Sequence, residues 1–395
     1  MWSVLHEIAA GIGLRLHLLY RMVTGKANAE YIAYRTARKI DELSNGGEPA
    51  IWFHGVSVGE VAALDSLIGE VRKRKPKVPI AVSTMTSDGL HTIRKLANQP
   101  EFAFIYPIDS SRNARRVVEN LRPAVLVIVD GDFWFQMLRA CRRAGVPMVV
   151  MNGRLSERSL RRHLRFPSYA REMFAGITLV SAQSKMMADR FAQFIEPKKI
   201  VVDGNVKLDA PLPRVTEDFG IDRSRFCFVF GSVHPAEIDA IAGPIGDVLA
   251  KHPEAQMVIA PRHPDKFTSP PIPHVIWINR LGVLRQLYQL CDAAFVGGTF
   301  CEVGGHNLAE PALAGKPVVY GPDVHSQVPL DEILQSYKAS MQVKTSEELG
   351  TAMMKLMEDR ALRETMGRNG ERLRADSQGL AGRLAERILS AANVL

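Results

Sequence analysis

The chain has 395 residues, of which 46% are hydrophobic and 23% are charged, and its formal net charge is +8. One hydrophobic core seldom serves so long a chain, so two domains are expected, and the composition excludes wholesale disorder and a polytopic membrane protein. The positive charge favours an anionic partner, either nucleic acid, acidic lipid or a phosphorylated substrate. Four widely spaced cysteines predict neither a disulfide framework nor a zinc site and fit a reducing compartment.

Residues 1–30 are predicted to form an amphipathic helix that associates with a membrane surface. Charged and histidine residues interrupt the apolar stretch before it reaches a spanning length, and no cleavage motif follows, which argues against a transmembrane helix and a secretory signal. The helix has two interpretations: it lies in the headgroup layer with Trp2 at its edge, or it packs on its own domain. Its apolar arc contains Leu5, Ile8, Ile12, Leu16, Leu19 and Val23.

Short apolar runs alternate with helical patterns from residue 50 onward, which predicts an α/β domain with a parallel sheet over residues 31–208. The predicted strands are 50–53, 79–82, 102–106, 124–129 and 147–151, with helices over 61–73 and 133–144. A proline-rich segment without helical periodicity predicts an interdomain linker over residues 209–222.

The same alternation returns over residues 223–395, so a second α/β domain is expected, with the alternative that its last helices cross back onto the first. Its predicted strands are 226–230, 257–260, 275–278, 293–296 and 317–320. In two Rossmann-like domains that face a central cleft, the strand carboxyl ends place ligand-binding loops on both walls.

Ser57-Val58-Gly59-Glu60 follows the first predicted strand and opens its helix, where backbone N–H groups and the helix dipole favour an anion. Glu60 could act as a general base that takes a proton from an acceptor hydroxyl. The alternative is a capping box, because Ser57 and Glu60 have the spacing of that motif.

Three further segments of the first domain carry polar side chains at strand ends. Thr84 and Thr86 could hold a carboxylate or a phosphate, or form an ordinary N-cap turn. Asp130 and Asp132 could hydrogen-bond sugar hydroxyls or cap the next helix, and no oxygen-rich cluster suggests a metal there. A basic segment after the fifth strand suits a phosphorylated glycolipid. Nucleic acid is the alternative, but no recognisable RNA- or DNA-binding motif accompanies the segment. The segment includes Asn152, Arg154, Arg161 and Arg162.

The second domain offers a candidate nucleotide site. Arg262, next to His263, and Lys207 could hold a nucleotide phosphate and stabilise a leaving group without a divalent metal. Glycines at 304 and 305 precede a predicted helix with a glutamate in its first turn, which suits phosphate and ribose contacts, and capping-box spacing is again the alternative. The residues of this segment are Gly304, Gly305, His306, Asn307 and Glu310.

Five segments together, in order and spacing, make the chain resemble the Kdo transferases, which add an acidic eight-carbon sugar to the lipid A precursor. The resemblance spans nearly the whole chain. The segments are WFHGVSVGE at 52–60, NGRLS at 152–156, GNVKLD at 204–209, PRHP at 261–264 and GGHNLAEP at 304–311.

The resemblance implies a GT-B fold, CMP-Kdo as donor, a diphosphorylated lipid A precursor as acceptor, and inverting transfer without a metal or other cofactor, at the cytoplasmic face of the inner membrane. It implies Glu60 as the base. Asp130 and Asp132 stand where the family usually has glutamates. Another GT-B transferase, a sugar-nucleotide epimerase and a catalytically silent glycolipid-binding relative are the alternatives. The family's acceptor side is expected at Ser57, Gly59, Thr84, Thr86, Asp130, Asp132, Asn152, Arg154, Arg161 and Arg162, and its donor side at Lys207, Arg262, His263, Gly304, Gly305, His306, Asn307 and Glu310.

Overall fold

A computed structural model shows the chain as two compact units. It describes residues 28–44, 46, 48–209, 211–267 and 272–393, together with residues 2, 6, 7, 11–13, 20, 21, 23 and 24. Unit 1 comprises Met1–Lys207 and Gly379–Leu395, and unit 2 comprises Leu208–Gln378. The division at residues 207 and 208 lies one residue before the predicted linker, whose residue 210 is outside the described part of the chain.

Unit 1 is built on a seven-stranded sheet in the order β3-β2-β1-β4-β5-β6-β7, and every neighbouring pair is parallel. Its central strands are continuous apolar runs because helices cover both faces of the sheet. The chain reverses its direction of strand addition between β1 and β4, which in such sheets places a ligand crevice at their carboxyl ends. The strands are β1 (Ala50–His54), β2 (Ile80–Thr84), β3 (Phe102–Ile105), β4 (Pro123–Val129), β5 (Met148–Gly153), β6 (Ile177–Ala182) and β7 (Ile200–Val202).

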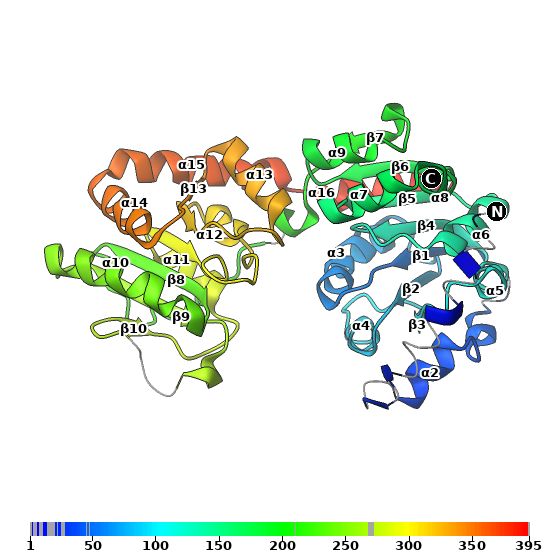
Figure 1. Ribbon diagram of the computed structural model, residues 1–395, viewed down its shortest axis with the longest axis horizontal. Helices are drawn as coiled ribbons and strands as arrows, with labels where there is room; N and C mark the ends of the chain where they lie inside the picture. Colours follow the sequence, from blue (N-terminus) through cyan, green and yellow to red (C-terminus); the bar gives the residue numbers. More distant parts are fainter. Residues whose placement is uncertain are drawn as a thin grey trace. The chain divides into compact units, whose positions relative to one another are not determined.

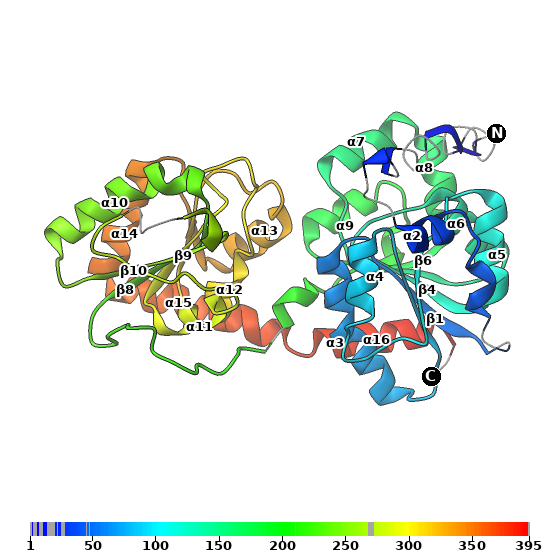
Figure 2. The same cartoon turned by 90° about the horizontal axis from the view of Figure 1, so that it is seen from below.

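Helices cover both faces of this sheet (Figures 1 and 2), and a hydrophobic core lies on each face. One core holds apolar side chains of α2, α5, α6, α8 and α9, and the other holds those of α3 and α16. The helices are α2 (Ala29–Arg35), α3 (Val58–Arg74), α4 (Ser87–Ile93), α5 (Ser111–Leu121), α6 (Phe135–Arg143), α7 (Glu157–Arg165), α8 (Pro167–Phe174) and α9 (Lys185–Phe191), with 3-10 turns η1 (Ile40–Leu43), η2 (Pro197–Lys199) and η3 (Val206–Asp209).

The last helix, α16 (Leu380–Ala391), belongs to unit 1 although the residues before it belong to unit 2. It lies against α3, as Figure 2 shows, and buries leucines and alanines in the same core. Arg387 pairs with Asp203 at 2.9 Å. The chain therefore passes twice between the two units.

Unit 2 repeats the design with six parallel strands in the order β10-β9-β8-β11-β12-β13. Successive side chains of β8 enter different cores, because strand side chains alternate between faces: Phe228 and Phe230 pack in one, Cys227 and Val229 in the other. The direction of strand addition reverses between β8 and β11. The strands are β8 (Cys227–Val233), β9 (Gln256–Pro261), β10 (Ile276–Trp277), β11 (Ala293–Val296), β12 (Val318–Tyr320) and β13 (Ser340–Gln342).

Helices cover both faces of the second sheet as well. Apolar side chains of α10 and α14 share a core on one face, and those of α11 pack on the other. The helices are α10 (Ile238–Lys251), α11 (Leu284–Leu290), α12 (Ala309–Leu313), α13 (Val328–Tyr337), α14 (Ser346–Glu358) and α15 (Arg360–Ser377), with 3-10 turns η4 (Pro235–Glu237) and η5 (Pro264–Lys266).

Most of the apolar arc predicted for residues 1–30 lies outside the described residues, including Leu5, Ile8, Leu16 and Leu19. Two of the residues that are described near the start contact later parts of unit 1. Trp2 donates to the Ser168 hydroxyl at 3.1 Å, and His6 lies 3.1 Å from a carboxylate oxygen of Asp109. Among the described helices, none combines the length and the hydropathy that a membrane crossing requires.

Candidate functional site

Glu60 lies in the first turn of α3, directly after the carboxyl end of β1. Its carboxylate accepts hydrogen bonds from the backbone N–H of Val56 at 2.7 Å and from the Ser57 hydroxyl at 2.9 Å, and Ser57 in turn accepts from the Glu60 N–H at 3.2 Å. The capping box, one of the two interpretations drawn from the spacing, is therefore formed. These bonds fix the carboxylate beside the carboxyl end of β1, and its role as a base stays a prediction.

Two more carboxylates, Asp130 and Asp132, follow the carboxyl end of the neighbouring strand β4. Burial raises the pKa of Asp130 to about 6, and the negative charge of Glu60 adds to the effect. The same two causes, burial first, raise the pKa of Asp132 to about 6. The part of each shift that comes from the Glu60 charge indicates that Glu60 lies near both aspartates. The fold thus concentrates three acids where a parallel sheet exposes its ligand-binding edge.

Asn152, at the end of β5, holds this cluster in place. Its amide donates to Asp130 Oδ1 at 2.6 Å, and its Oδ1 accepts from the backbone N–H of Val206 at 3.0 Å. The next residue, Lys207, is exposed, and its positive charge partly offsets the rise in the Asp130 pKa. Asn152 therefore connects the acids to the segment that carries Lys207.

The loops after β4 and β5 approach each other closely at Gly131. The Arg154 N–H donates to the Asp130 carbonyl at 2.8 Å. A Cβ atom at residue 131 would lie 2.0 Å from the Arg154 carbonyl oxygen, so only glycine fits this contact. The close contact brings the Arg154 charge to bear on Asp130.

The threonines at the end of β2 and just after it use their hydroxyls in hydrogen bonds to nearby backbone. Thr84 is buried and donates to the Val56 carbonyl at 3.1 Å. Thr86 is the N-cap of α4 and accepts from the Gly89 N–H at 2.9 Å. The N-cap turn that the sequence offered as an alternative is present, and ligand binding by either threonine stays a prediction.

The basic segment forms α7 and presents most of its arginines to solvent. Arg161 pairs with Glu157 at 2.9 Å, within the helix. Arg162 differs, because its charge partly offsets the raised pKa of Asp132 and so acts on the acidic cluster. Two apolar side chains lie among these arginines, Leu164 and Phe166, at 46% and 48% exposure.

In unit 2, three histidines and an arginine gather at the carboxyl ends of the strands. His234 and His306 stack with their Nε2 atoms 2.7 Å apart, and the His263 ring meets His234 edge-on at 5.5 Å. Burial lowers the pKa of His306 to about 4, and the charges of His234 and Arg262 lower it further. At neutral pH this cluster therefore offers the uncharged His306 ring near the Arg262 guanidinium group.

Glu237, which the sequence analysis did not single out, organises the loop after β11. Its buried carboxylate accepts from the backbone N–H groups of Gly298 at 2.7 Å, Thr299 and Phe300 at 2.9 Å each, and His234 at 3.0 Å. A buried carboxylate is stable only with such a set of donors. The signal in the sequence was its position three residues after His234, which the structure shows as a capping box.

The two predicted glycines adopt left-handed conformations, with φ of +81° at Gly304 and +84° at Gly305. At Gly304 the space of a Cβ is filled by Ser326 and His325, with Ser326 Oγ only 2.4 Å away. The backbone conformation and the chain's own side chains therefore account for glycine at residue 304. Phosphate contact there stays a prediction.

Asn307 and Glu310 meet at the start of α12. The Asn307 amide donates to Glu310 Oε1 at 3.2 Å, and its oxygen accepts from the Ala309 N–H at 3.2 Å. The N-cap is Leu308, so the capping box suggested by the spacing is not formed. Burial raises the pKa of Glu310, against the opposing charge of Arg285.

No set of three or more His, Cys, Asp or Glu side chains within the part of the chain that the structure covers is arranged to hold a metal ion. The candidate residues thus form one acidic cluster in unit 1 and one histidine-rich cluster in unit 2.

Comparison with known proteins decides the family. Residues 29–210 match the model of the 3-deoxy-D-manno-octulosonic-acid transferase (kdotransferase) family. A 3-deoxy-D-manno-octulosonic acid transferase of Chlamydia muridarum is 30% identical to the chain, over 92% of this chain and 91% of that protein. The chain belongs to the Kdo transferase family. A Kdo transferase of Haemophilus influenzae is 26% identical over 85% of this chain and 86% of its own.

Solved structures place this Kdo transferase family member in the GT-B fold. A glycosyltransferase from Rickettsia africae matches with a TM-score of 0.59 at 10% identity, over 87% of this chain and 99% of its own. A UDP-GlcNAc 2-epimerase from Neisseria meningitidis, bound to UDP-GlcNAc, matches with a TM-score of 0.57 at 13% identity, over 86% of this chain and 100% of its own. The expected GT-B fold is confirmed, and the chain is a glycosyltransferase by family.

Proposed function

We propose that this Kdo transferase family member moves Kdo from CMP-Kdo to a hydroxyl of the phosphorylated lipid A precursor in lipopolysaccharide synthesis, with inversion and without a metal. Membership of the family supports the transferred sugar and its pathway. The observation that carries the chemistry is the convergence of Glu60, Asp130 and Asp132 at the β1/β4 crevice.

Glu60 is the proposed base. When the acceptor hydroxyl attacks the anomeric carbon of Kdo, its proton passes to the Glu60 carboxylate and the bond from Kdo to the CMP phosphate breaks. The bonds from Val56 and Ser57 hold the carboxylate in one orientation before the substrate arrives.

The acceptor carries phosphate groups, and unit 1 offers arginines to meet them. Arg154 and Arg162 act on the acidic cluster, and Arg161 lies on the same exposed helix as Arg162. A guanidinium fork matches phosphate geometry, so these side chains would orient the glycolipid. Asp130 and Asp132 would accept hydrogen bonds from its sugar hydroxyls.

Unit 2 is the proposed donor side. Arg262, together with Lys207 at the end of the first segment of unit 1, would stabilise the negative charge of departing CMP, with His263 and the neutral His306 as hydrogen-bonding partners. The carboxylate of Glu310 would accept from ribose hydroxyls, with Asn307 beside it. Support comes from the position of these residues at the carboxyl ends of strands in a Rossmann-like unit.

We place the protein at the cytoplasmic face of the inner membrane, peripherally associated. Exposed apolar side chains support this: Ile12 and Val23 in the first residues are 60% and 79% exposed, and Leu164 and Phe166 lie among arginines. Such a mixture suits an anionic lipid surface.

The test is an assay of the purified protein with CMP-Kdo and the lipid A precursor, which follows CMP release and the mass of the glycolipid. A gain of one or more Kdo residues, abolished in Glu60→Gln, supports the proposal. Turnover of a UDP-sugar instead would indicate another GT-B transferase or an epimerase. Glycolipid binding without turnover of any donor would indicate a catalytically silent relative.

A further inference from the structure

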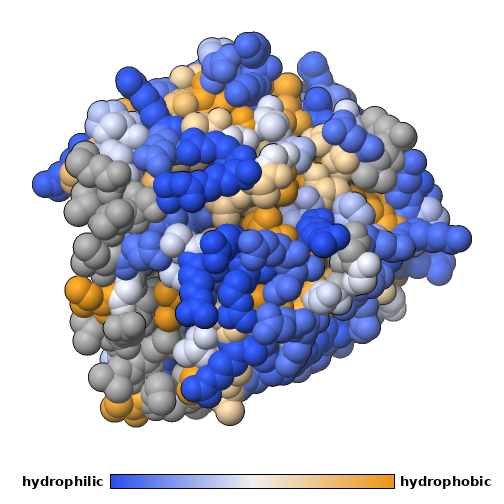
Figure 3. Space-filling view, turned by 90° about the vertical axis from the view of Figure 1, so that its right-hand side faces the viewer, coloured by the Kyte–Doolittle hydropathy of each residue, from blue (hydrophilic) through white to orange (hydrophobic). Residues whose placement is uncertain are grey.

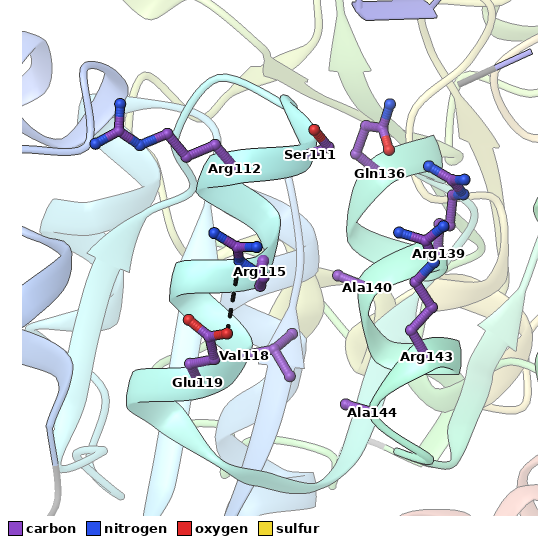
Figure 4. Close-up of a pocket in the computed structure, with 10 residues that line it drawn as sticks. All are labelled: Ser111, Arg112, Arg115, Val118, Glu119, Gln136, Arg139, Ala140, Arg143 and Ala144. Carbon is purple, nitrogen blue, oxygen red and sulfur yellow. Dashed lines mark ion pairs between the residues drawn. The ribbon is translucent and has the colours of Figure 1, made fainter. Parts of the chain in front are cut away.

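An open groove runs between α5 and α6 on one face of unit 1. The two helices pack beside each other, and the groove between them has a volume of about 540 Å³ (Figure 4). Small side chains at Ala140 and Ala144 leave this space free. The lining residues are Ser111, Arg112, Arg115, Val118, Glu119, Gln136, Arg139, Ala140, Arg143 and Ala144. None of them belongs to the candidate transfer site.

The groove carries a strong excess of positive charge. Two arginines come from each helix at three- or four-residue spacing, which puts them on the facing sides, and Glu119 is the one acid among the lining residues. Arg115 pairs with Glu119 at 3.6 Å, and Arg139 with Glu172 at 3.7 Å.

The other two arginines, Arg112 and Arg143, are exposed and have no ion-pair partner within the described chain. Figure 4 shows Arg112 near the start of α5 and Arg143 near the end of α6, at opposite ends of the groove. Together with Arg115 and Arg139, they give the groove a positive potential along its length, which a bound anion would offset.

The helix N-termini beside the groove already have internal carboxylates. Asp109 accepts from the backbone N–H groups of Gln136 and Met137 at 2.9 Å each, and Glu7 accepts from the Ser111 N–H at 3.1 Å. An anion in the groove would therefore be recognised by guanidinium groups on the helix sides. This favours a ligand that accepts paired hydrogen bonds from several guanidinium groups, as a phosphate group does.

We propose that the α5–α6 groove binds a phosphate-bearing anion, at a site separate from the acceptor and donor sites of the transfer reaction. Its volume falls within the range of small-ligand sites and holds a phosphate or diphosphate group with part of its substituent. Figure 3 shows projecting hydrophilic side chains between apolar areas on this side of unit 1, which is compatible with a phosphate from solution or from a lipid headgroup.

Two probes distinguish these sources. Calorimetric titration with inorganic pyrophosphate measures the soluble source, and co-sedimentation with phosphatidylcholine vesicles, with and without phosphatidylglycerol, measures the lipid source. The full-length wild type is compared with Arg112→Gln/Arg143→Gln. The matched control is Arg38→Gln/Arg122→Gln, which removes the same charge from exposed positions of unit 1 outside the groove. Circular dichroism and the melting temperature verify folding of each variant.

The groove variant should bind the preferred probe at least about tenfold more weakly, while the control keeps wild-type affinity. Arg112→Lys/Arg143→Lys should fall between them, because it keeps the charge and loses the forks. Binding of pyrophosphate by the wild type identifies a soluble ligand. Binding only to vesicles that contain phosphatidylglycerol identifies a lipid headgroup as the ligand. Absence of binding to both probes, or equal binding by the groove variant and the control, overturns the proposal. CMP release in the transfer assay tests the proposed function independently, because it does not depend on whether the groove binds an anion.

Discussion

The amide of Asn152 donates a 2.6 Å hydrogen bond to Oδ1 of Asp130, and both residues have left-handed backbone, with φ of +56° and +61°. Non-glycine residues adopt this conformation with some strain, least for Asn and Asp. The pair joins the ends of β4 and β5 beside the acidic cluster. The backbone strain of these two residues and the repulsion between Asp130 and Glu60 therefore occur at the same place.

Asp130→Asn should stabilise unit 1 by about 1–2 kcal/mol at pH 8. Asparagine accepts the same bond and tolerates the same φ, but it removes a half-buried charge from beside Glu60. The folded-state pKa of Asp130 is raised to about 6. Ionisation therefore destabilises the fold above pH 6, and this cost disappears as the pH falls toward about 4. Urea unfolding of both proteins at pH 8 and pH 4.5 measures the difference, and a gap that widens at low pH would contradict the assignment.

Glu60→Gln should reduce kcat of Kdo transfer by about 10²- to 10⁴-fold and leave the melting temperature nearly unchanged. Glutamine keeps the capping bonds to Val56 and Ser57 but cannot take a proton. Ser57→Ala measures the loss of the cap separately: it should cost about 1 kcal/mol of stability, while the Glu60 carboxylate stays and keeps its bond from Val56. Full activity in Glu60→Gln would remove Glu60 from the reaction.

Gly59→Ala should stabilise unit 1 by about 0.5–1 kcal/mol and yet raise KM for the acceptor. Gly59 is in α3, and a Cβ there would meet nothing within 4 Å, so packing does not require glycine. A ligand approaching the first turn would require it. Gly131→Ala is the contrast, since its Cβ would overlap the Arg154 carbonyl, and it should destabilise the unit by about 2 kcal/mol or more. An alanine at 59 that changes neither KM nor kcat would exclude close ligand approach.

Glu237→Gln should destabilise unit 2 by about 2–4 kcal/mol and weaken CMP binding. An amide group in place of one carboxylate oxygen would oppose the backbone donors of Gly298 and its neighbours, which then remain buried without an acceptor. Glu302→Gln, at an exposed position of the following segment, should have little effect on either property. Denaturant unfolding and calorimetry measure the two quantities, and equal behaviour of the variants would show that Glu237 does not organise the loop.

His306 should remain neutral down to about pH 5. Its folded-state pKa is lowered to about 4, below the ordinary value of 6.5. Its neutral form therefore contributes stability that is present above about pH 6.5 and is lost as the pH falls toward 4. Titration of the imidazole proton resonances, with His306→Asn to assign the signal, measures the pKa. A midpoint near 6.5 would be incompatible with the buried stack on His234.

The apolar runs of the sequence were sufficient to predict the central strands of both sheets. Strands β1, β4, β8 and β11 lie within a few residues of their predicted positions, because buried parallel strands are continuous apolar segments. Strands β6, β7 and β13 were not predicted. β7 and β13 are three-residue edge strands with partly exposed side chains, so their sequences carry little of that signal.

In the candidate site, too, some features were predictable from the sequence and others depend on tertiary contacts. The pattern of parallel strands and the residue types at strand ends allowed Glu60, Asp130 and Asp132 to be placed at one edge of a sheet from the sequence. Their mutual charge effects, and the bridge through Asn152 to the segment of Lys207, depend on atoms far apart in the chain. Glu237 was missed for this reason: three of its four backbone donors lie about sixty residues later.

By itself, the sequence determined the two α/β units, the family and the residues that follow each central strand, since these depend on local periodicity and on motifs. Only the tertiary structure decided that α16 returns to unit 1 and that α5 and α6 form an arginine-lined groove. It also decided that Glu60 caps a helix and at the same time contributes to the raised pKa of two aspartates. The physical reason is that burial, electrostatic repulsion and hydrogen bonding act through space, between side chains whose separation in the sequence carries no record of their proximity.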